Sequence, residues 1–374
     1  MKNIVKFLFI YIFSQVFIYT QSIPHKYICK KPHFFSNLNQ LNKKINHQDH
    51  IDVTFYDISL EIDLDNENLI GNVLTQLKKL SESNDKILFN ISDYLNVEDV
   101  RINGSSIDFI HNNDILEIEI PLSIEEKILN IEIKYNGIPF QGNNSGITFL
   151  ERFDQKLNNT YKHLYTLSEP YGGKDWWPGI HDPSDKADSV NINVTINKGQ
   201  MVVSNGLLSN IDSTSNENLV TYQWKERYPI ATYLVSLAIY PYDFWEQSFQ
   251  SSNGKILPIH HYVFPDQKEY FENNYNKTPE VLKVLSDFFG EYPFIEEKYG
   301  HVSFLWPGGM EHQTISSMCC PDMYLIVHEA AHQWWGDMVT CKDFNNIWLN
   351  EGFATYSQAL WYEKKKVLKL EINL

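Results

Sequence analysis

The 374-residue sequence predicts an α+β multidomain protein, in which an all-β antiparallel domain precedes a domain that contains helices. The first observation is the alternation of apolar and polar residues in several segments, which is the period of a half-buried strand. The second is that no long amphipathic helix occurs before about residue 257, and the third is a change to helical spacing after it. We therefore expect an all-β domain over residues 51–257 and a second domain over residues 258–374.

Strand-like alternation is clearest at residues 58–64, where Ile58, Leu60 and Ile62 are separated by polar residues. The same pattern recurs at residues 118–120, 131–133 and 190–196. Turn dipeptides such as Asn103-Gly104 separate these segments. We expect them to be strands of one antiparallel domain.

Helical signals begin after a polar turn at residues 251–254, where we place the domain boundary. Thr278 is a suitable N-cap, Pro279 fits the first helical position, and an apolar stripe then runs to Gly290. The elements expected to follow are a strand at residues 302–305, a turn at Gly308-Gly309, a helix at about 322–335 and a helix that carries Glu351.

Two histidines and two glutamates indicate a metal site. His328 and His332 are four residues apart on the predicted helix and therefore share one face, where both imidazoles can reach one ion. A catalytic zinc site has three nitrogen or oxygen ligands from the protein and an open position. We predict that Glu351 is the third ligand of one zinc ion per chain. Glu329 is the predicted general base, which takes a proton from water activated by zinc.

The alternative interpretation of this motif is an incidental histidine pair on a polar turn of an amphipathic helix. The flanking residues 324–327 and Trp334-Trp335 make the helix apolar on nearly all sides. Such a helix is buried, and two buried histidines beside a glutamate need a partner. Zinc would be that partner.

Charge and composition restrict the possible partners. The net charge is −16, and the only basic run is Lys364-Lys365-Lys366, so we expect no nucleic-acid partner. Hydrophobic residues make up 43% of the chain, which is enough to fill a sizeable core.

Residues 1–22 have the pattern of a secretory signal peptide: a lysine-containing start, an apolar run at residues 7–19 and a polar end. An uncleaved signal anchor is the alternative, but the apolar run is short for a bilayer. We expect a polar lead at residues 23–50. We also expect a mature chain that is secreted, periplasmic or at the cell surface, without a stable membrane span.

The four cysteines are too few for a disulfide framework: Cys29, Cys319, Cys320 and Cys341. Either of the adjacent cysteines, Cys319 or Cys320, could pair with Cys341 in an oxidising compartment. Free buried thiols are the alternative.

The metal motif and its surroundings resemble the M1 zinc aminopeptidases, which are gluzincins with a thermolysin-like catalytic domain. The resemblance is carried by HEAAHQWWGDMVT (328–340), WLNEGFATY (348–356) and PGGMEHQT (307–314), with further matches at residues 168–170, 176–189, 203–206 and 231–235. It implies a saddle of β-sheets that covers one side of the active site. The thermolysin-like domain would follow, with residues 258–374 as its first part.

The resemblance also implies a substrate site. The exopeptidase motif of the family falls on Gly308, Gly309, Met310 and Glu311, with His312 in place of asparagine. Its glutamate binds the free α-amine of the substrate, and its backbone lies along the peptide as an added edge strand. Glu169 matches a β-domain residue that helps to hold the substrate N-terminus. The alternatives are a solvated loop carboxylate for Glu311 and a structural salt bridge for Glu169.

The implied function is a zinc-dependent aminopeptidase that hydrolyses N-terminal residues from peptides with a free N-terminus. Asn350 either orients a ligand histidine or caps a helix. The family's oxyanion-stabilising tyrosine lies well downstream of the third ligand, and neither Tyr356 nor Tyr362 matches its motif. We therefore expect a C-terminally truncated chain with little or no aminopeptidase activity.

Three other functions stay open. One is the epoxide hydrolysis of a related branch of the family, and another is a non-catalytic protein that binds peptides. The third is an endopeptidase, against which Glu311 argues.

Overall fold

The computed structural model describes residues 47–81, 86–143, 145–213 and 217–372, and the statements below concern these residues. The predicted signal peptide, Cys29 and most of the polar lead lie outside them.

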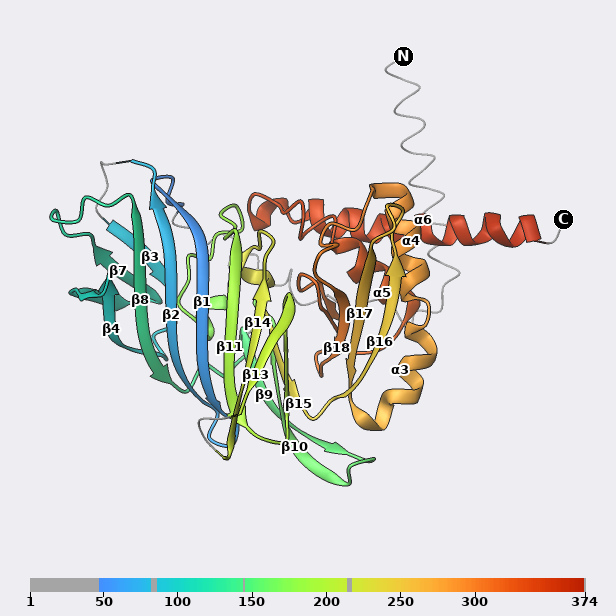
Figure 1. The fold of residues 1–374 in the computed structure, drawn as a ribbon, viewed down its shortest axis with the longest axis horizontal. Helices are drawn as coiled ribbons and strands as arrows, with labels where there is room; N and C mark the ends of the chain where they lie inside the picture. The colour runs from blue at the N-terminus through green and yellow to red at the C-terminus, as the bar shows by residue number, and fades with distance from the viewer. Residues whose placement is uncertain (1–46, 82–85, 144, 214–216, 373–374) are drawn as a thin grey trace, which may run out of the picture. The chain divides into compact units, whose positions relative to one another are not determined.

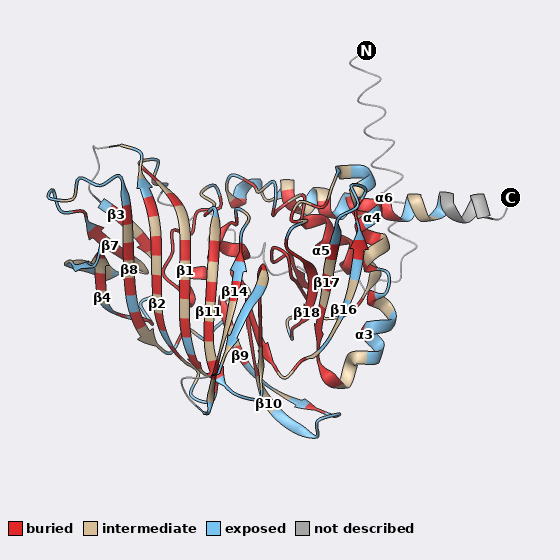
Figure 2. Ribbon diagram, viewed as in Figure 1, coloured by how far each residue is buried: buried red, intermediate tan, exposed pale blue. Residues whose placement is uncertain are grey.

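The largest element is an eight-stranded sheet with the strand order β13-β14-β11-β1-β2-β8-β4-β5 (Figure 1). Its strands are β1 (Ile51–Asp63), β2 (Asn68–Lys79), β4 (Asn96–Ile102), β5 (Ser105–Ser106), β8 (Ile128–Gly137), β11 (Ser189–Asn197), β13 (Leu207–Asp212) and β14 (Leu219–Glu226). Figure 2 shows buried and less buried residues alternating along the long strands β1, β2, β8 and β11. In β1, for example, Ile58, Leu60 and Ile62 are buried and Glu61 is exposed, as the sequence predicts.

The antiparallel prediction is wrong for one pair of neighbours in this sheet. Strands β1 and β11 run parallel, with Phe55 opposite Ser189 and Glu61 opposite Thr195. A tight turn enforces an antiparallel pair, whereas β1 and β11 are joined by a long connection that leaves their direction open.

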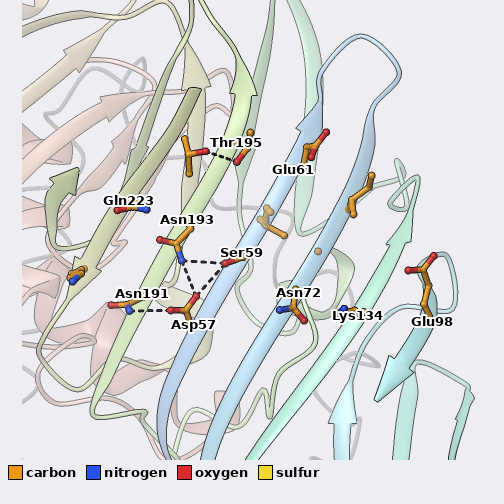
Figure 3. A pocket seen from close by; sticks show the side chains of 15 residues that line it. Asp57, Ser59, Glu61, Asn72, Glu98, Lys134, Asn191, Asn193, Thr195 and Gln223 are labelled. Atoms are coloured by element: carbon orange, nitrogen blue, oxygen red, sulfur yellow. Dashed lines mark hydrogen bonds between the residues drawn. The ribbon is translucent and has the colours of Figure 1, made fainter. Parts of the chain in front are cut away.

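The outer face of the eight-stranded sheet carries an open polar pocket (Figure 3). Asn191 and Asn193 donate to the two carboxylate oxygens of Asp57 over 3.1 and 2.8 Å. Ser59 also donates to Asp57, and Thr195 bonds to Thr221. These polar groups therefore satisfy one another.

Two smaller sheets complete the N-terminal part. A four-stranded sheet has the order β12-β15-β10-β9, and a three-stranded sheet has the order β3-β7-β6. Their strands are β3 (Lys86–Asn90), β6 (Phe109–Asn112), β7 (Ile115–Glu119), β9 (Ile147–Asp154), β10 (Asn159–Thr166), β12 (Met201–Ser204) and β15 (Leu237–Tyr240).

A five-stranded sheet, β16-β17-β18-β20-β19, forms the base of the C-terminal part. Its strands are β16 (Asp243–Gln250), β17 (Ile256–Val263), β18 (Tyr299–Ser303), β19 (Gly309–Met310) and β20 (Ser316–Met318). The turn at residues 251–254, predicted as the domain boundary, joins β16 to β17 within this sheet. This polar turn closes a hairpin within one sheet. The chain passes from the N-terminal sheets to the five-stranded sheet earlier, between β15 and β16.

Four α-helices accompany this sheet: α3 (Lys268–Tyr275), α4 (Thr278–Phe289), α5 (Met323–His332) and α6 (Trp348–Ile372). Helix α4 lies against β16, α5 lies against β19 and β20, and α4, α5 and α6 contact one another (Figure 1). The remaining helical turns are η2 (Gly173–Asp175), η3 (Thr232–Leu234), η4 (Pro265–Gln267) and η5 (Phe344–Asn346). The predicted α+β fold class, with a β domain before a part that contains the helices, is confirmed.

Two details of the helices differ from the predictions. The N-cap of α4 is Lys277 rather than Thr278, which is the first helical residue and is buried. Helix α3 was not predicted, because only Phe271 and Tyr275 of its eight residues are buried, which is too few for a periodic apolar stripe. In the described part of the chain, the structure contains no helix with the length and apolar character needed to cross a membrane.

His163 makes the stability of this fold sensitive to acid. It is buried on β10, where its Nε2 lies 3.1 Å from the Tyr242 hydroxyl, which in turn donates to the Ser303 carbonyl. Burial lowers the pKa of His163 to about 3. Because this is below the unfolded value of about 6.5, its contribution to stability is present above pH ~6.5 and is lost as the pH falls towards 3.

We predict that His163→Gln reduces the loss of unfolding free energy between pH 7 and pH 5 by about 2 kcal/mol relative to the wild type. Urea unfolding at the two pH values measures this difference. His50→Gln is the matched control, since the His50 ring bonds to the Lys86 carbonyl near the surface. An equal loss in the wild type and in His163→Gln would contradict the prediction.

Candidate active site

Helix α5 presents the two predicted histidine ligands on one face. Its N-cap is Asp322, whose carboxylate accepts hydrogen bonds from the backbone N–H groups of Tyr324 and Leu325 over 2.9 and 3.4 Å. The helix is buried from Leu325 to its last residue, His332. It is shorter than predicted because the chain turns after His332, which brings the Trp335 carbonyl back to the His332 ring.

That carbonyl determines which nitrogen of His332 faces the other ligands. Nδ1 lies 3.0 Å from the Trp335 oxygen, which can only accept, so Nδ1 carries the proton. In a neutral ring, Nε2 then has a free lone pair. Hydrogen bonds of this type orient metal-binding histidines and raise their basicity.

The ligand atoms of His328, His332 and Glu351 converge on one point. The two Nε2 atoms are 3.1 Å apart, and Glu351 Oε2 lies 3.2 Å from His328 Nε2 and 3.8 Å from His332 Nε2. Ligands about 2.0–2.1 Å from a tetrahedral zinc ion are about 3.3 Å from one another, so these three residues fit zinc. Glu351 lies in the first turn of α6, and its side chain is 22% exposed, which leaves an approach to the site.

Glu329 lies on the same helix and packs against the backbone of β19. A Cβ atom added to Gly309 would lie 2.3 Å from Glu329 Oε1 and 2.7 Å from its Cγ. Gly309 therefore must be a glycine for the Glu329 carboxylate to remain in its place. Gly308 is close to a second side chain, because a Cβ atom there would lie 2.2 Å from the Trp306 ring.

Strand β19 is an edge strand of the five-stranded sheet. Gly309 and Met310 pair with Met318 and Ser317 of β20, and no other described strand pairs with β19. An extended peptide can add to such an edge through backbone hydrogen bonds. Met310 is buried, and Glu311 follows directly at the end of the strand.

Glu311 is completely buried, which excludes the alternative of a solvated loop carboxylate. Oxygens of Glu169, Glu311 and Glu351 lie within 4.8 Å of one another, and Glu311, Glu329 and His332 form a second group of the same size. Several buried carboxylates so close together repel one another unless a cation lies between them. The arrangement therefore favours the binding of positive charge at this site.

The segment after Glu311 connects the pocket to the β domain and to α5. Asn205 Nδ2 donates to the Gln313 carbonyl over 2.7 Å, and the Gly206 N–H donates to Thr314 Oγ1 over 2.8 Å. The Thr314 N–H donates to Gln333 Oε1, next to His332, over 2.9 Å. Thr314 has a φ of 67°, a strained conformation for a β-branched residue, which these bonds hold in place.

Three further buried residues at the site were not predicted from the sequence. Burial and the charges of Glu311 and Glu329 raise the pKa of Asp337 well above its usual value. Burial, together with the charges of Glu311 and Glu169, raises the pKa of Tyr233 far above its usual value and that of Cys341 to about 12. The sequence signals for Asp337 are its place in the segment 328–340, which carries the family resemblance, and its carboxylate in the apolar stretch after His332.

Asn350 has neither of its two predicted roles. It lies inside α6, where its Oδ1 accepts from the Cys341 N–H over 3.2 Å and its Nδ2 donates to the Tyr233 hydroxyl over 3.0 Å. The partner that orients His332 is the Trp335 carbonyl instead.

Tyr356 is 57% exposed, and Tyr362 packs on the ring of Tyr324 at 4.6 Å. Of the two possibilities left open for the cysteines, pairing of Cys341 with Cys319 or Cys320 is not present, because none of the three described cysteines forms a disulfide.

Two family models match this chain. The Peptidase M1 N-terminal domain matches residues 52–234, and the Peptidase family M1 domain matches residues 312–372. The two matches together cover more than half of the sequence. The chain therefore belongs to the M1 family of peptidases.

Curated relatives are aminopeptidases of much greater length. Leucine aminopeptidase 2 of Coccidioides immitis (strain RS) is 24% identical over 323 residues, which are 80% of this chain and 49% of that protein. Probable aminopeptidase 1 of Sulfurisphaera tokodaii is 27% identical over 278 residues, which are 70% of this chain and 33% of that protein. The chain thus spans half or less of the length of these relatives.

Solved structures of M1 zinc metallopeptidases share the fold. The enzyme from Deinococcus radiodurans superimposes with a TM-score of 0.72 at 26% identity and covers 85% of this chain and 71% of its own. A mutant M1 zinc metallopeptidase from the same organism, bound to a Tyr-Ser-Ala substrate, gives a TM-score of 0.70 at 25% identity, with 85% and 72% covered.

We predict that Glu351→Ala lowers the affinity for zinc by at least about 100-fold, because it removes one of three ligands. Glu329→Gln should retain zinc, since Glu329 is not one of the three. Zinc bound per chain, measured by mass spectrometry of the metal after dialysis, compares the two variants. Equal zinc contents in both variants would contradict this assignment of ligands.

We predict that Gly309→Ala displaces the Glu329 carboxylate and impairs any turnover as strongly as Glu329→Gln, while zinc is retained. Gly352→Ala is the matched control, because a Cβ atom there meets nothing within 4 Å. The measurement is peptide hydrolysis together with zinc content. Normal turnover in Gly309→Ala would show that Glu329 does not need this contact.

Proposed function

We propose that this chain carries the active site of a zinc-dependent aminopeptidase, which releases N-terminal residues from peptides with a free N-terminus. The observation that carries the proposal is the position of Glu311, which follows the edge strand β19 and lies close to His332, and of Glu169, which lies close to Glu311 and Glu351. An amine pocket so close to the metal-binding residues favours cleavage of the first peptide bond over cleavage within the chain.

Substrate binding would use both the edge strand and the carboxylates. The peptide backbone would extend along β19, and its α-ammonium group would lie between Glu311 and Glu169. Charge-assisted hydrogen bonds to buried carboxylates are strong and directional. They would fix the first peptide carbonyl at a constant distance from His328, His332 and Glu351.

The chemistry would depend on Glu329. A zinc ion held by the three ligands would polarise the carbonyl and lower the pKa of a water molecule. Glu329, held against Gly309, would accept the proton of the attacking water and then deliver it to the leaving amine. Burial of the site keeps bulk water away from this proton transfer.

Names of the relatives support this proposal, since they are aminopeptidases and zinc metallopeptidases, and one mutant was crystallised with a tripeptide substrate. We also propose, from the pattern of residues 1–22 alone, that the protein is exported. A non-catalytic peptide-binding protein is the second candidate, because the same pocket and edge strand would bind peptides without turnover.

The test is binding and hydrolysis of a tripeptide with a free N-terminus and of its N-acetylated form by the zinc-loaded chain. We expect the free peptide to bind at least about 30-fold more tightly, because acetylation leaves the buried carboxylates without an ammonium partner. Glu311→Gln should abolish most of this preference. The control Glu61→Gln, on β1 of the eight-stranded sheet, should retain it. Calorimetry on the Glu329→Gln background measures binding without turnover.

Equal binding of the two peptides by the wild type would overturn the proposal that Glu311 and Glu169 bind the α-ammonium group. Chelator-sensitive release of the first residue would support the aminopeptidase. Strong binding of the free peptide without any release would instead favour the non-catalytic candidate. Hydrolysis of the acetylated peptide at the same rate would indicate an endopeptidase.

A further inference from the structure

Cys319 and Cys320 form a pair of thiols in the segment that joins strand β20 to helix α5. They follow β20 directly and precede Pro321 and Asp322, the N-cap of α5. Their two Sγ atoms are 3.1 Å apart, and both residues are partly exposed. Small reagents can therefore reach this pair, in contrast to the buried Cys341.

Hydrogen-bond donors around Cys320 stabilise its thiolate. The Cys319 thiol donates to Cys320 Sγ, and the Asp322 backbone N–H is a second donor. Although burial opposes this effect, the two donors lower the pKa of the Cys320 thiol to about 7. A thiol with a pKa near the ambient pH is the most effective attacking group in thiol–disulfide exchange.

Cys341 provides an internal contrast. Burial, together with the charges of Glu169 and Glu311, raises its pKa to about 12. It is both inaccessible and protonated, so it should remain inert under conditions in which an exposed thiol reacts.

We propose that Cys319 and Cys320 are a vicinal dithiol site that reacts with low-molecular-weight disulfides, with Cys320 as the attacking thiol and Cys319 as the resolving thiol. The Cys320 thiolate attacks one sulfur of the disulfide RSSR, which forms a mixed disulfide and releases one RS⁻. The Cys319 thiol then loses its proton and attacks Cys320 Sγ, which releases the second RS⁻. The protein loses two electrons and two protons, and RSSR becomes two RSH.

Closure of this disulfide must alter the local backbone. Adjacent Cα atoms are about 3.8 Å apart across a trans peptide, whereas disulfides usually join Cα atoms about 4.4–6.8 Å apart. The Cys319 N–H donates to the Gly308 carbonyl over 2.9 Å, and the Phe304 N–H donates to the Met318 carbonyl over 3.2 Å. A change at Cys319 is therefore transmitted to Gly308, the residue that precedes β19. If peptides bind along β19, as the proposed function requires, the oxidised form should bind them more weakly.

The experiment treats the folded full chain with oxidised glutathione at pH 7, followed by alkylation of the remaining thiols and peptide mass spectrometry. In the wild type we expect the peptide with Cys319 and Cys320 to lose the mass of two hydrogen atoms. Cys319→Ser should stop at a glutathione adduct on Cys320. Cys320→Ser should react at least about five-fold more slowly at Cys319, because the activated thiolate is absent. Circular dichroism verifies that both variants are folded.

A Cys320→Ser variant that reacts as fast as the wild type would overturn the proposal, as would a Cys319→Ser variant without the adduct. Modification of Cys341 at the rate of Cys320 would overturn it as well, since reactivity would then be non-specific. Tripeptide binding to the reduced and oxidised forms tests the effect on β19. If neither form binds peptide, the proposed function fails, whereas the thiol chemistry is still measured independently. Equal binding by both forms would show that oxidation of Cys319 and Cys320 does not affect peptide binding along β19.

Discussion

The negative charge buried around His332 is the constraint on which the rest of the site depends. Glu311, Glu329 and Glu351 approach two histidines in a region with little solvent, and Asp337 adds a fourth carboxyl group whose pKa is strongly raised. Such a group of acids is costly to bury unless cations compensate it. The ligand geometry provides for one cation among His328, His332 and Glu351. A cation bound by these ligands would therefore offset the cost of burying the acids.

Repulsion would separate these carboxylates if the segments that carry them were flexible. The hydrogen bonds around Thr314 hold the segment after Glu311 in place and so oppose this separation. Thr314 is held by the Gly206 N–H on one side and by Gln333 on the other, while Asn205 holds the preceding carbonyl. A left-handed β-branched residue costs of order 1–3 kcal/mol, which the surrounding bonds must offset. Because Glu311 is three residues away and Gln333 is next to His332, the same contacts position both Glu311 and helix α5.

Local patterns predicted the metal site, because the four-residue spacing of His328 and His332 is a property of one helix. Features formed between distant segments were not predictable in the same way. The parallel pairing of β1 and β11 depends on a long connection, and the turn at residues 251–254 has the composition of either a hairpin or a linker. Tyr233 became visible as a site residue only when the fold brought it next to Asn350. Helix α3 lacked a periodic signal altogether.

The link between Tyr233 and Asn350 gives the β domain a role beyond covering the site. Asn350 precedes Glu351 in the first turn of α6, and its amide is fixed by the Tyr233 hydroxyl on one side and by the Cys341 N–H on the other. Tyr233 belongs to η3 of the N-terminal part and packs on Phe344 of η5 at 5.2 Å. The position of Glu351 therefore depends on the β domain, which also carries Glu169. Since Glu169 and Glu351 are held by the same part of the fold, their separation is set by one packed unit. If Glu169 binds the substrate amine, as the proposed function requires, that separation determines which peptide bond the site can reach.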